Sequence, residues 1–577
     1  MSSYMETYQH WIDSPSISEA EWAELNAIAD DAHEIEERFY EPLSFGTAGL
    51  RGIMGMGTHR MNVHVIRHAT QAFAEVMAQE GAEAMEKGIV ICYDCRNNSD
   101  VFAREAACVM AANGIRVRLF EALRPTPELS FAIRYYGATA GINVTASHNP
   151  KEYNGYKVYW SDGAQLPPER ADKVAERMNA TDVFAAPRRV DFDEAVEKGL
   201  IELIGEETDK AYMERVMAQA IEPDVVARVA DELRIVYTPF HGCGHVLVPE
   251  ALRRLGVKHL FPVDEQMVLD GNFPTVVSPN PENPEGFYLA VDLARKVDSD
   301  LIIGTDPDSD RVGVLVRRGD EYVPITGNQM GELLLDYIIS ARRRTGAMPE
   351  HPAALTTIVT TAMIRRICEV NNIHFDETFT GFKFMAEKLA EYEKDGSYEY
   401  LLAFEESYGY MMGDYVRDKD AVTASMMIAE MAAWWKTQGK TLLDAIDALY
   451  EKYGYYQEET VNLVIEGLDG VRRIRAIMES LRTEPLDTVG GLEVKQVRDY
   501  QDGVIRSGRG EVVGRTHISG SNALYFELCD GSNFVVRPSG TEPKLKMYAL
   551  AHADSREACS EKKTSIADFA RSLGDRG

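Results

Sequence analysis

Four short apolar runs, spread widely along the chain, each lead directly into a loop of polar side chains. The first ends in the loop 145–150, and the others are residues 301–305, 400–404 and 533–536. Such a run is typical of a strand that is buried on both faces. In α/β proteins, ligands bind at the carboxyl ends of these strands. The four loops therefore predict an α/β architecture in which they line one cleft.

The spacing of the apolar residues predicts a β-α-β rhythm after an N-terminal helix. We expect helices at 18–40, 63–80 and 100–113, and strands at 88–94 and 115–120. A strand at 233–237 precedes Gly242-Cys243-Gly244, which we interpret as a strand–helix turn because the third glycine of a dinucleotide fingerprint is absent. Residues 421–435 predict a packed helix. The pattern changes near residue 455 to shorter strands and turns.

Composition excludes several classes of protein. A net charge of -31 argues against a nucleic-acid partner, although a local cluster of cations can still bind a small phosphorylated ligand. No apolar stretch is long enough to cross a membrane and no secretion signal precedes the first helix, so we expect a cytoplasmic protein. The seven cysteines predict no disulfide framework, and Cys92 and Cys95 are expected to be reduced.

Three carboxylates alternate directly after the second apolar run. Asp306, Asp308 and Asp310 can all turn toward one hard divalent cation, because three acids so close together repel one another unless a cation offsets them. The glycine and closing glutamate of an EF-hand loop are missing. Magnesium is the natural ion for oxygen ligands beside phosphate, and calcium remains open on ligand type alone.

A cation in this place would give Ser147 a chemical role. Phosphoryl transfer depends on placing donor and acceptor in line and neutralising the phosphate oxygens, so a phosphate on Ser147 beside the metal would be poised for donation. His148 and Lys157 are the candidates for proton transfer, and we expect nearby cations to lower the pKa of Lys157. A hydrolase pair of Ser147 and His148 is unattractive, since sequence neighbours at a turn seldom meet and no G-x-S-x-G elbow is present.

Two further loops contain residues suited to a phosphosugar. Arg537, Ser539, Gly540 and Thr541 resemble a phosphate clamp, with a guanidinium fork, hydroxyls and an approachable backbone. Glu405 and Ser407 could hydrogen-bond vicinal hydroxyls, or could form a structural polar network. Near the N-terminus, three glycines in 44–52 flank Arg51, which could meet an anion or lie in a plain turn.

Taken together, these stretches resemble the α-D-phosphohexomutase superfamily, from about residue 44 to 548. The resemblance implies three similar α/β domains with mixed sheets and a smaller α+β C-terminal domain around a central cleft. We expect an N-terminal helix with the phosphoserine domain at 1–205, the metal-loop domain at 206–318, the sugar-binding domain at 319–455 and the phosphate-binding domain at 456–577. Residues 44–52 and 380–383 resemble the longer phosphoglucomutase and phosphopentomutase branch, although some relatives have His or Trp where Phe382 stands.

The resemblance also implies roles for individual residues. Ser147 would carry the phosphoryl group and bind one Mg²⁺ together with Asp306, Asp308 and Asp310. Lys157, His148 and Arg51 resemble the acid–base region. The implied substrate contacts are Arg311, Thr380, Gly381, Lys383, Glu405, Ser407, Lys419, Arg537, Ser539, Gly540 and Thr541.

The implied reaction interconverts glucose 1-phosphate and glucose 6-phosphate through a 1,6-bisphosphate, which also serves as activator. Mannose and pentose phosphates remain open as substrates. A metal-dependent sugar phosphatase and a non-catalytic sugar-phosphate sensor are the alternatives from other classes. The expected partner is a small phosphosugar, with no nucleic acid or membrane, and the chain is expected to be a monomer or a homodimer.

Overall fold

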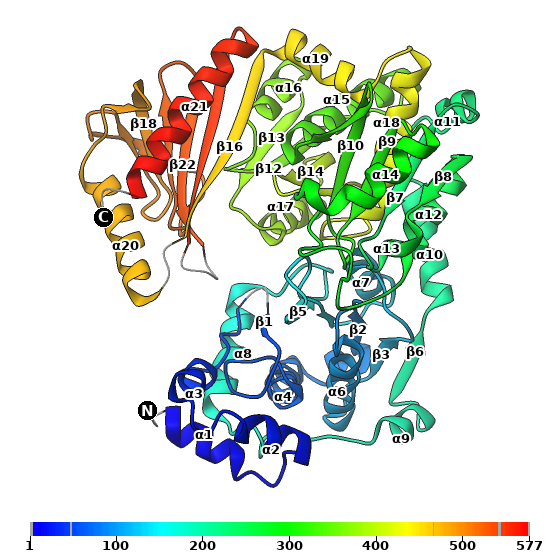
Figure 1. The fold of residues 1–577 in the computed structure, drawn as a ribbon, viewed down its shortest axis with the longest axis vertical. Coiled ribbons are helices and arrows are strands. Elements are labelled where there is room, and N and C mark those ends of the chain that lie inside the picture. The colour runs from blue at the N-terminus through cyan, green and yellow to red at the C-terminus, as the bar shows by residue number, and fades with distance from the viewer. Residues whose placement is uncertain (1–3, 47–48, 465–466, 540–543, 575–577) are drawn as a thin grey trace. The chain divides into compact units, whose positions relative to one another are not determined.

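The computed structural model describes residues 4–46, 49–464, 467–539 and 544–574 (Figure 1). The chain divides into two compact units. Unit 1 comprises Met1–Gly327 and Ser407–Thr441, and unit 2 comprises Asn328–Glu406 and Leu442–Gly577. Among the described residues, no helix combines the length and the apolarity needed to cross a bilayer.

The first sheet of unit 1 has six strands in the order β1-β5-β4-β2-β3-β6. Their bounds are β1 Leu50–Ile53, β2 Ile89–Tyr93, β3 Val117–Phe120, β4 Ala140–Val144, β5 Tyr153–Trp160 and β6 Ile201–Ile204. Strands β4, β2, β3 and β6 are parallel, while β5 and β1 run antiparallel to their neighbours. The predicted strands at 88–94 and 115–120 are confirmed, and β4 lies in the same sheet.

Helices cover both faces of this sheet because its central strands are apolar on both sides. In β2, Ile89 and Ile91 join the cluster that contains α4 and α6, whereas Val90 and Cys92 join the cluster with α7. Alternate side chains of a strand point to opposite faces, so β2 is buried on both faces. The covering helices are α4 Val63–Gln79, α6 Ser99–Ala112, α7 Thr126–Tyr135 and α8 Pro168–Ala180. The helices predicted at 63–80 and 100–113 are confirmed.

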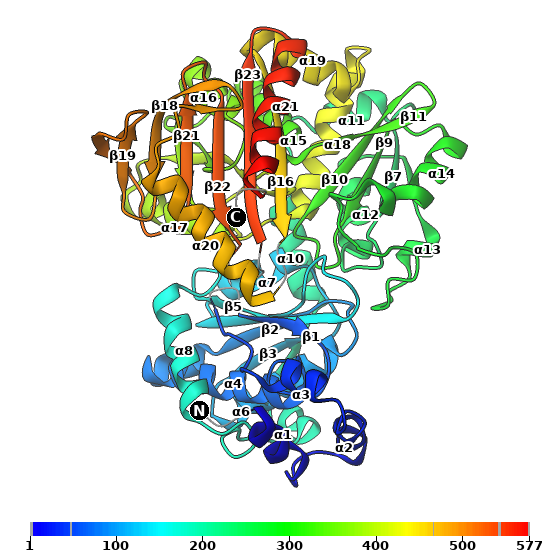
Figure 2. The same ribbon diagram turned by 60° about the vertical axis from the view of Figure 1, so that its left-hand side comes forward.

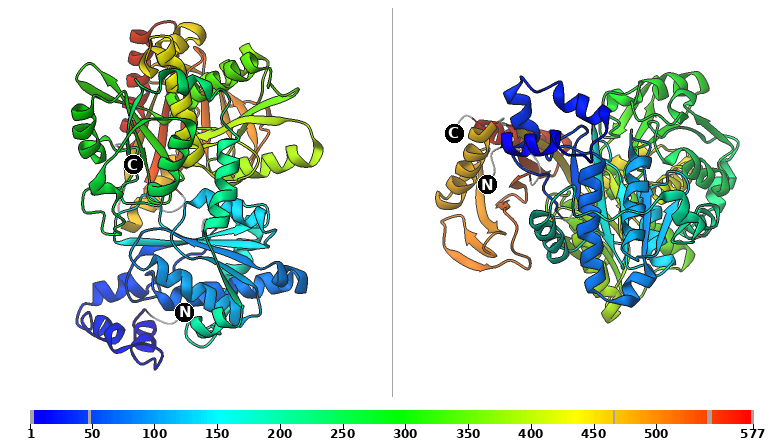
Figure 3. Two further views of the ribbon diagram at one scale, coloured as in Figure 1. Left: turned by 90° about the vertical axis from the view of Figure 1, so that its right-hand side faces the viewer. Right: turned by 90° about the horizontal axis from the view of Figure 1, so that it is seen from below.

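The N-terminal segment differs from the prediction of a single helix at 18–40. It forms α1 Tyr4–Ile12, α2 Glu19–Asn26 and α3 Ala32–Phe39. Asp31 caps α3 by accepting a hydrogen bond from the Glu34 amide, and this cap starts a new helix where continuous periodicity suggested none. These dark blue helices lie at the end of unit 1 that is farthest from the green strands (Figure 3).

The second sheet of unit 1 has the order β11-β10-β9-β7-β8. Its strands are β7 Arg234–Thr238, β8 His259–Pro262, β9 Leu301–Thr305, β10 Val312–Arg318 and β11 Glu321–Ile325. Strands β8, β7 and β9 are parallel, and β10 and β11 are antiparallel. The helices and short strand around this sheet are α10 Glu206–Met217, α11 Asp224–Val229, α12 Gly244–Leu255, α13 Asp264–Met267, α14 Tyr288–Val297, β15 Gly409–Met411 and α18 Ala421–Thr437. Helix α9 Phe192–Glu197 packs instead against α6 and β6 of the first sheet.

Unit 2 contains a parallel set of three strands and a larger antiparallel sheet. The parallel strands are β12 Pro352–Thr357, β13 His374–Thr378 and β14 Glu399–Glu405, with α15 Gly327–Thr345, α16 Met363–Asn371, α17 Phe382–Asp395 and α19 Leu442–Tyr453. The antiparallel strands are β16 Tyr455–Val464, β18 Leu492–Asp499, β19 Val504–Ser507, β20 Val512–Arg515, β21 Leu524–Leu528, β22 Asn533–Pro538 and β23 Lys544–Ala553. Helices α20 Gly467–Thr483 and α21 Arg556–Leu573 lie against one face of this sheet (Figure 2). The pattern changes near residue 455 as predicted, but the expectation of shorter strands is wrong for β16 and β23, which have 10 residues each.

Candidate active site

Ser147 follows β4 in a tight loop of unit 1. The residue is 3% exposed, and its backbone is left-handed with φ 50°. Its hydroxyl donates to Asp306 Oδ2 at 2.8 Å, which joins the loop after β4 to the loop after β9. The two strand ends that sequence reasoning singled out therefore meet, although 159 residues separate them.

His148 contacts its sequence neighbour, contrary to expectation. Its Nδ1 lies 3.2 Å from Ser147 Oγ because the left-handed turn at Ser147 brings the two side chains to the same side. Loss of solvent and the charges of Arg311 and Arg51 lower the pKa of His148 well below its usual value. A neutral imidazole in contact with the serine hydroxyl can exchange a proton with it.

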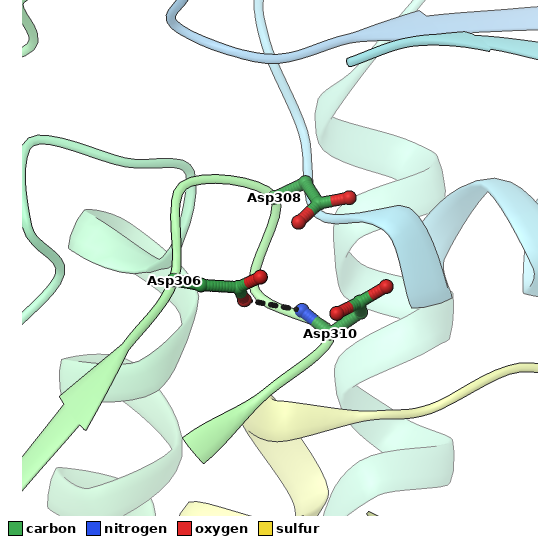
Figure 4. Close-up of side chains that lie close together, drawn as sticks. All are labelled: Asp306, Asp308 and Asp310. Atoms are coloured by element: carbon green, nitrogen blue, oxygen red, sulfur yellow. Dashed lines mark hydrogen bonds between the residues drawn. The ribbon is translucent and has the colours of Figure 1, made fainter. Parts of the chain in front are cut away.

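The three aspartates gather around one point at the end of β9 (Figure 4). A carboxylate oxygen from each lies within 4.8 Å of the others, and all three residues are buried. Asp306 Oδ1 accepts from the amides of Asp310 at 3.0 Å and Arg311 at 2.9 Å, which closes the loop. Burial and the neighbouring charges of Asp308 and Asp310 raise the pKa of Asp306 well above its usual value.

The donor set fits a hard divalent cation. Asp308 Oδ1 and Asp310 Oδ1 are buried and have no hydrogen-bond partner among the described residues. A buried carboxylate oxygen without a hydrogen bond is costly, and a cation bound between the three side chains would satisfy both atoms. The trio can therefore bind a metal, and the Ser147 hydroxyl lies beside it.

The glycines at the start of α12 leave room for the aspartate loop. A side chain on Gly242 would come within 2.4 Å of the Pro307 backbone, and one on Gly244 within 2.7 Å of Ser309 Oγ. The Cys243 amide donates to the Pro307 carbonyl at 2.7 Å. The Gly-Cys-Gly stretch thus packs against the chain's own loop, and the interpretation as a strand–helix turn is confirmed.

Lys157 reaches the same cluster from β5. Antiparallel pairing places Lys157 opposite Asn143 near the end of β4. Its ammonium donates to Asp308 Oδ2 at 2.8 Å and lies 3.4 Å from Asp310 Oδ2. Although burial opposes the charge, the two aspartates raise the pKa of Lys157. The expectation of a lowered pKa is wrong for this arrangement, and Lys157 is kept protonated.

Three other predicted residues of unit 1 lie close to these loops. Lys419 Nζ is 3.3 Å from Asp310 Oδ2. Arg51 Nη1 donates to the Asn149 side chain at 3.0 Å. Arg311 Nη1 donates to Glu282 at 2.7 Å and to the Ser407 carbonyl at 3.1 Å. Unit 1 therefore brings together every predicted catalytic and metal residue, together with Arg311, Ser407 and Lys419.

The remaining predicted residues belong to unit 2. Glu405 ends β14, and Thr380, Gly381 and Lys383 lie where α17 begins. Arg537 is the next-to-last residue of β22 Asn533–Pro538 and donates to the Tyr548 hydroxyl at 3.2 Å. The Ser539 amide donates to the Lys544 carbonyl at 2.7 Å. Gly540 and Thr541 lie outside the described residues.

Glu406 was not singled out from the sequence. Burial and the charge of Glu405 raise its pKa to about 7, with Arg537 and Lys546 opposing the shift. The Glu405-Glu406 pair and Arg537 thus share one electrostatic environment in unit 2.

Sequence reasoning also missed several groups that hold the loops of unit 1. The Thr126 hydroxyl donates to Asp308 Oδ2 at 2.8 Å and accepts from Asn143 Nδ2 at 2.7 Å. Asp94 and Arg96 lie buried against the serine loop. The signal available for Asp94 and Arg96 was their position directly after the apolar strand β2.

Three family models match successive parts of the chain. They describe α/β/α domains I, II and III of phosphoglucomutase/phosphomannomutase and match residues 42–183, 210–319 and 326–453. The phosphoglucomutase of Staphylococcus haemolyticus is 35% identical over 533 residues, which is 91% of this chain and 93% of that protein. The Staphylococcus aureus enzyme is 36% identical over 520 residues, covering 89% and 91% of the two chains.

Solved structures share the fold at lower identity. A putative phosphomannomutase from Thermus thermophilus superposes with a TM-score of 0.67 at 21% identity, covering 93% of this chain and 99% of that one. The phosphoglucomutase parafusin of Paramecium gives a TM-score of 0.67 at 17% identity, covering 92% and 94%. The chain belongs to the phosphoglucomutase/phosphomannomutase family within the α-D-phosphohexomutases, which makes it an isomerase that transfers a phosphoryl group within its substrate.

Proposed function

We propose that this enzyme interconverts glucose 1-phosphate and glucose 6-phosphate, with Ser147 as the phosphoryl carrier. The curated relatives, about 35% identical over most of the chain, are phosphoglucomutases, and phosphoglucomutase activity is what they support here. The single observation that carries the role of Ser147 is its 2.8 Å hydrogen bond to Asp306, within a trio of carboxylates suited to a cation.

In the proposed first half-reaction, a sugar hydroxyl attacks the phosphorus atom on Ser147. The bond from phosphorus to Ser147 Oγ breaks as the bond to the sugar oxygen forms, which gives glucose 1,6-bisphosphate. The proton of the sugar hydroxyl passes to the neutral imidazole of His148. Ser147 Oγ receives a proton from the group formed by His148, Lys157 and Arg51 as its bond to phosphorus breaks, so no net proton is consumed. Mg²⁺ bound by Ser147 and the three aspartates would neutralise the charge on the phosphate oxygens.

In the second half-reaction, Ser147 Oγ attacks the other phosphate of the bisphosphate. The bond from that phosphorus to the sugar oxygen breaks, and the sugar oxygen takes a proton in place of the one that leaves Oγ. For this step the enzyme must bind the phosphate that is not being transferred, and we assign that task to Arg537, Ser539, Gly540 and Thr541. Arg311, Thr380, Gly381, Lys383, Glu405, Ser407 and Lys419 are the proposed sugar contacts. The proposed domains are 1–205, 206–318, 319–455 and 456–577.

The test is an assay of isomer formation from glucose, mannose, ribose and deoxyribose 1-phosphates with Mg²⁺ and a trace of the bisphosphate. We expect glucose 1-phosphate to be converted fastest, and Ser147→Ala to lose nearly all activity while its thermal unfolding stays close to wild type. Release of free phosphate in place of isomer would favour the phosphatase alternative. A Ser147→Ala variant with the wild-type rate would overturn the proposed role.

A further inference from the structure

Arg96 binds the backbone of the loop that carries Ser147. The side chain extends from the turn after β2 and is 2% exposed. Nη2 donates to the carbonyls of Ser147, at 2.6 Å, and Asn149. Nη1 donates to the carbonyls of Pro150 at 2.9 Å and Tyr153 at 3.0 Å. One guanidinium therefore holds four carbonyls within seven residues of chain.

Asp94 completes the arrangement from the other side. Its Oδ1 accepts from the Arg96 amide at 2.9 Å and the Ser99 hydroxyl at 2.8 Å, and its Oδ2 accepts from the Thr145 hydroxyl at 2.6 Å. Because the Thr145 proton is committed to Asp94, its oxygen is free to accept from the Ser147 amide at 2.8 Å. Asp94 thus orients the hydroxyl that holds Ser147.

Both backbone polar groups of Ser147 are fixed by these contacts. Its amide is bound by Thr145 and its carbonyl by Arg96. A left-handed backbone is unfavourable for a serine and persists only where the surroundings determine it. Here that backbone, with φ 50°, directs the hydroxyl to Asp306.

Phe273 closes the remaining face of Arg96. The ring belongs to the segment after α13, is 2% exposed, and has its centroid 5.1 Å from the guanidinium carbon. The neighbouring Asn272 accepts a hydrogen bond from Asn97 at 3.0 Å. Water is kept from the guanidinium, which strengthens its hydrogen bonds to the carbonyls.

We propose that Arg96, held by Asp94 and covered by Phe273, is a positioning residue. It keeps Ser147 Oγ beside the three aspartates of the loop after β9 through both half-reactions. The inference rests on the proposed function of Ser147. Arg96 binds carbonyl oxygens, not the hydroxyl that reacts. Its contacts can therefore stay unchanged while Ser147 gains and loses phosphate.

The decisive variant is Arg96→Lys. It keeps a positive charge beside Asp94, but an ammonium has three donors on one atom and cannot bind four carbonyls in this geometry. We expect kcat to fall about 100-fold, the loss that a misplacement of about 1 Å can cause. The KM for glucose 1-phosphate should stay within about threefold, as expected when ground-state binding is intact. The single-turnover rate of Ser147 phosphorylation by glucose 1,6-bisphosphate should fall with kcat.

Arg118→Lys is the matched control. Arg118 is also a buried arginine of the first sheet, 7% exposed, donating to the Lys87 carbonyl at 3.1 Å and lying 4.8 Å from the Tyr136 ring centroid. It should lose comparable thermal stability and keep its kcat. If the kcat of Arg96→Lys is within about threefold of this control, the positioning role is overturned.

A second variant serves if Arg96→Lys does not fold. Phe273→Leu keeps an apolar side chain and removes only the ring face, and we expect a smaller fall in kcat with KM unchanged; a wild-type kcat would count against the inference.

Wild type and Ser147→Ala are assayed alongside. A wild type that does not isomerise, or an active Ser147→Ala, refutes the proposed function itself, whereas an active wild type with a fully active Arg96→Lys refutes only the inference about Arg96.

Discussion

Asp308 uses its two carboxylate oxygens differently. Oδ2 accepts from Thr126 and Lys157, both at 2.8 Å, while Oδ1 is buried and has no hydrogen-bond partner among the described residues. Although burial opposes ionisation, Lys157 holds the pKa of Asp308 below its usual value. Asp308 is thus kept as an anion with one oxygen available to a metal.

Replacing Asp308 with Asn should weaken Mg²⁺ binding about tenfold or more, because it removes one negative charge from the cluster and a proposed ligand. The measurements are direct Mg²⁺ binding without substrate and the Mg²⁺ concentration that gives half-maximal activity. Asp231→Asn, at an exposed ion pair with Lys258, is the control and should leave both unchanged. Equal Mg²⁺ affinity of the two variants would contradict the ligand role of Asp308.

Residue types and strand ends were enough to locate Ser147 and the three aspartates, because the carboxyl ends of buried strands can be read from apolar runs. The contact between His148 and Ser147 could not be predicted, since it depends on a left-handed backbone that nothing local requires of a serine. The raised pKa of Lys157 could not be predicted from the sequence either. It depends on Asp308 and Asp310, which lie about 150 positions away in sequence and whose ion pairs outweigh burial.

At the level of elements, α15 and β16 of unit 2 share a pair of glutamates. The Thr361 hydroxyl donates to Glu332 at 2.8 Å and also hydrogen-bonds Glu458. Burial, then the charge of Glu458, raises the pKa of Glu332 well above its usual value. Burial raises the pKa of Glu458 to about 7, against hydrogen bonds from Thr361 and Asn328 and the charge of Lys563.

This pair should make unit 2 less stable as the pH rises. The folded pair binds more protons than the unfolded chain between about pH 4.5 and 7, so the free energy of unfolding falls across that window. Glu332→Gln should flatten this part of the profile of melting temperature against pH. Glu451→Gln, at an exposed position of α19, should leave the profile as in wild type. A Glu332→Gln profile with the wild-type slope would refute the coupling.

Most element boundaries followed from periodicity, because buried strands such as β2 and amphipathic helices such as α4 repeat their apolar residues regularly. The segment 18–40 was the exception. Apolar and helix-forming residues continue through it, yet the Asp31 cap begins a second helix. A capping residue inside an otherwise regular pattern is a local signal that a prediction from periodicity alone misses.

For the whole molecule, the net charge is -31, yet several of the proposed ligand contacts are cationic side chains. Lys157 and Lys419 are 4% and 6% exposed, so their charges act on the cluster of aspartates and not on the outer surface. In unit 2, Arg537 lies near Glu406 and Tyr548. An acidic protein can thus still place cations locally, as we expected from its sequence for a small phosphorylated ligand.

The proposed cycle needs unit 2 as well as the serine of unit 1, and Arg537→Ala tests that requirement. Loss of a charge-assisted hydrogen bond to phosphate, about 1.5–3 kcal/mol, should raise KM for glucose 1-phosphate about tenfold or more. Binding of Mg²⁺ should not change, because the three aspartates belong to unit 1. Arg571→Ala, at an arginine of α21 paired with Glu459 and Asp568, is the control and should keep the wild-type KM. If Arg537→Ala also keeps the wild-type KM, the phosphate that is not transferred must be bound elsewhere, and the assigned role of the loop after β22 fails.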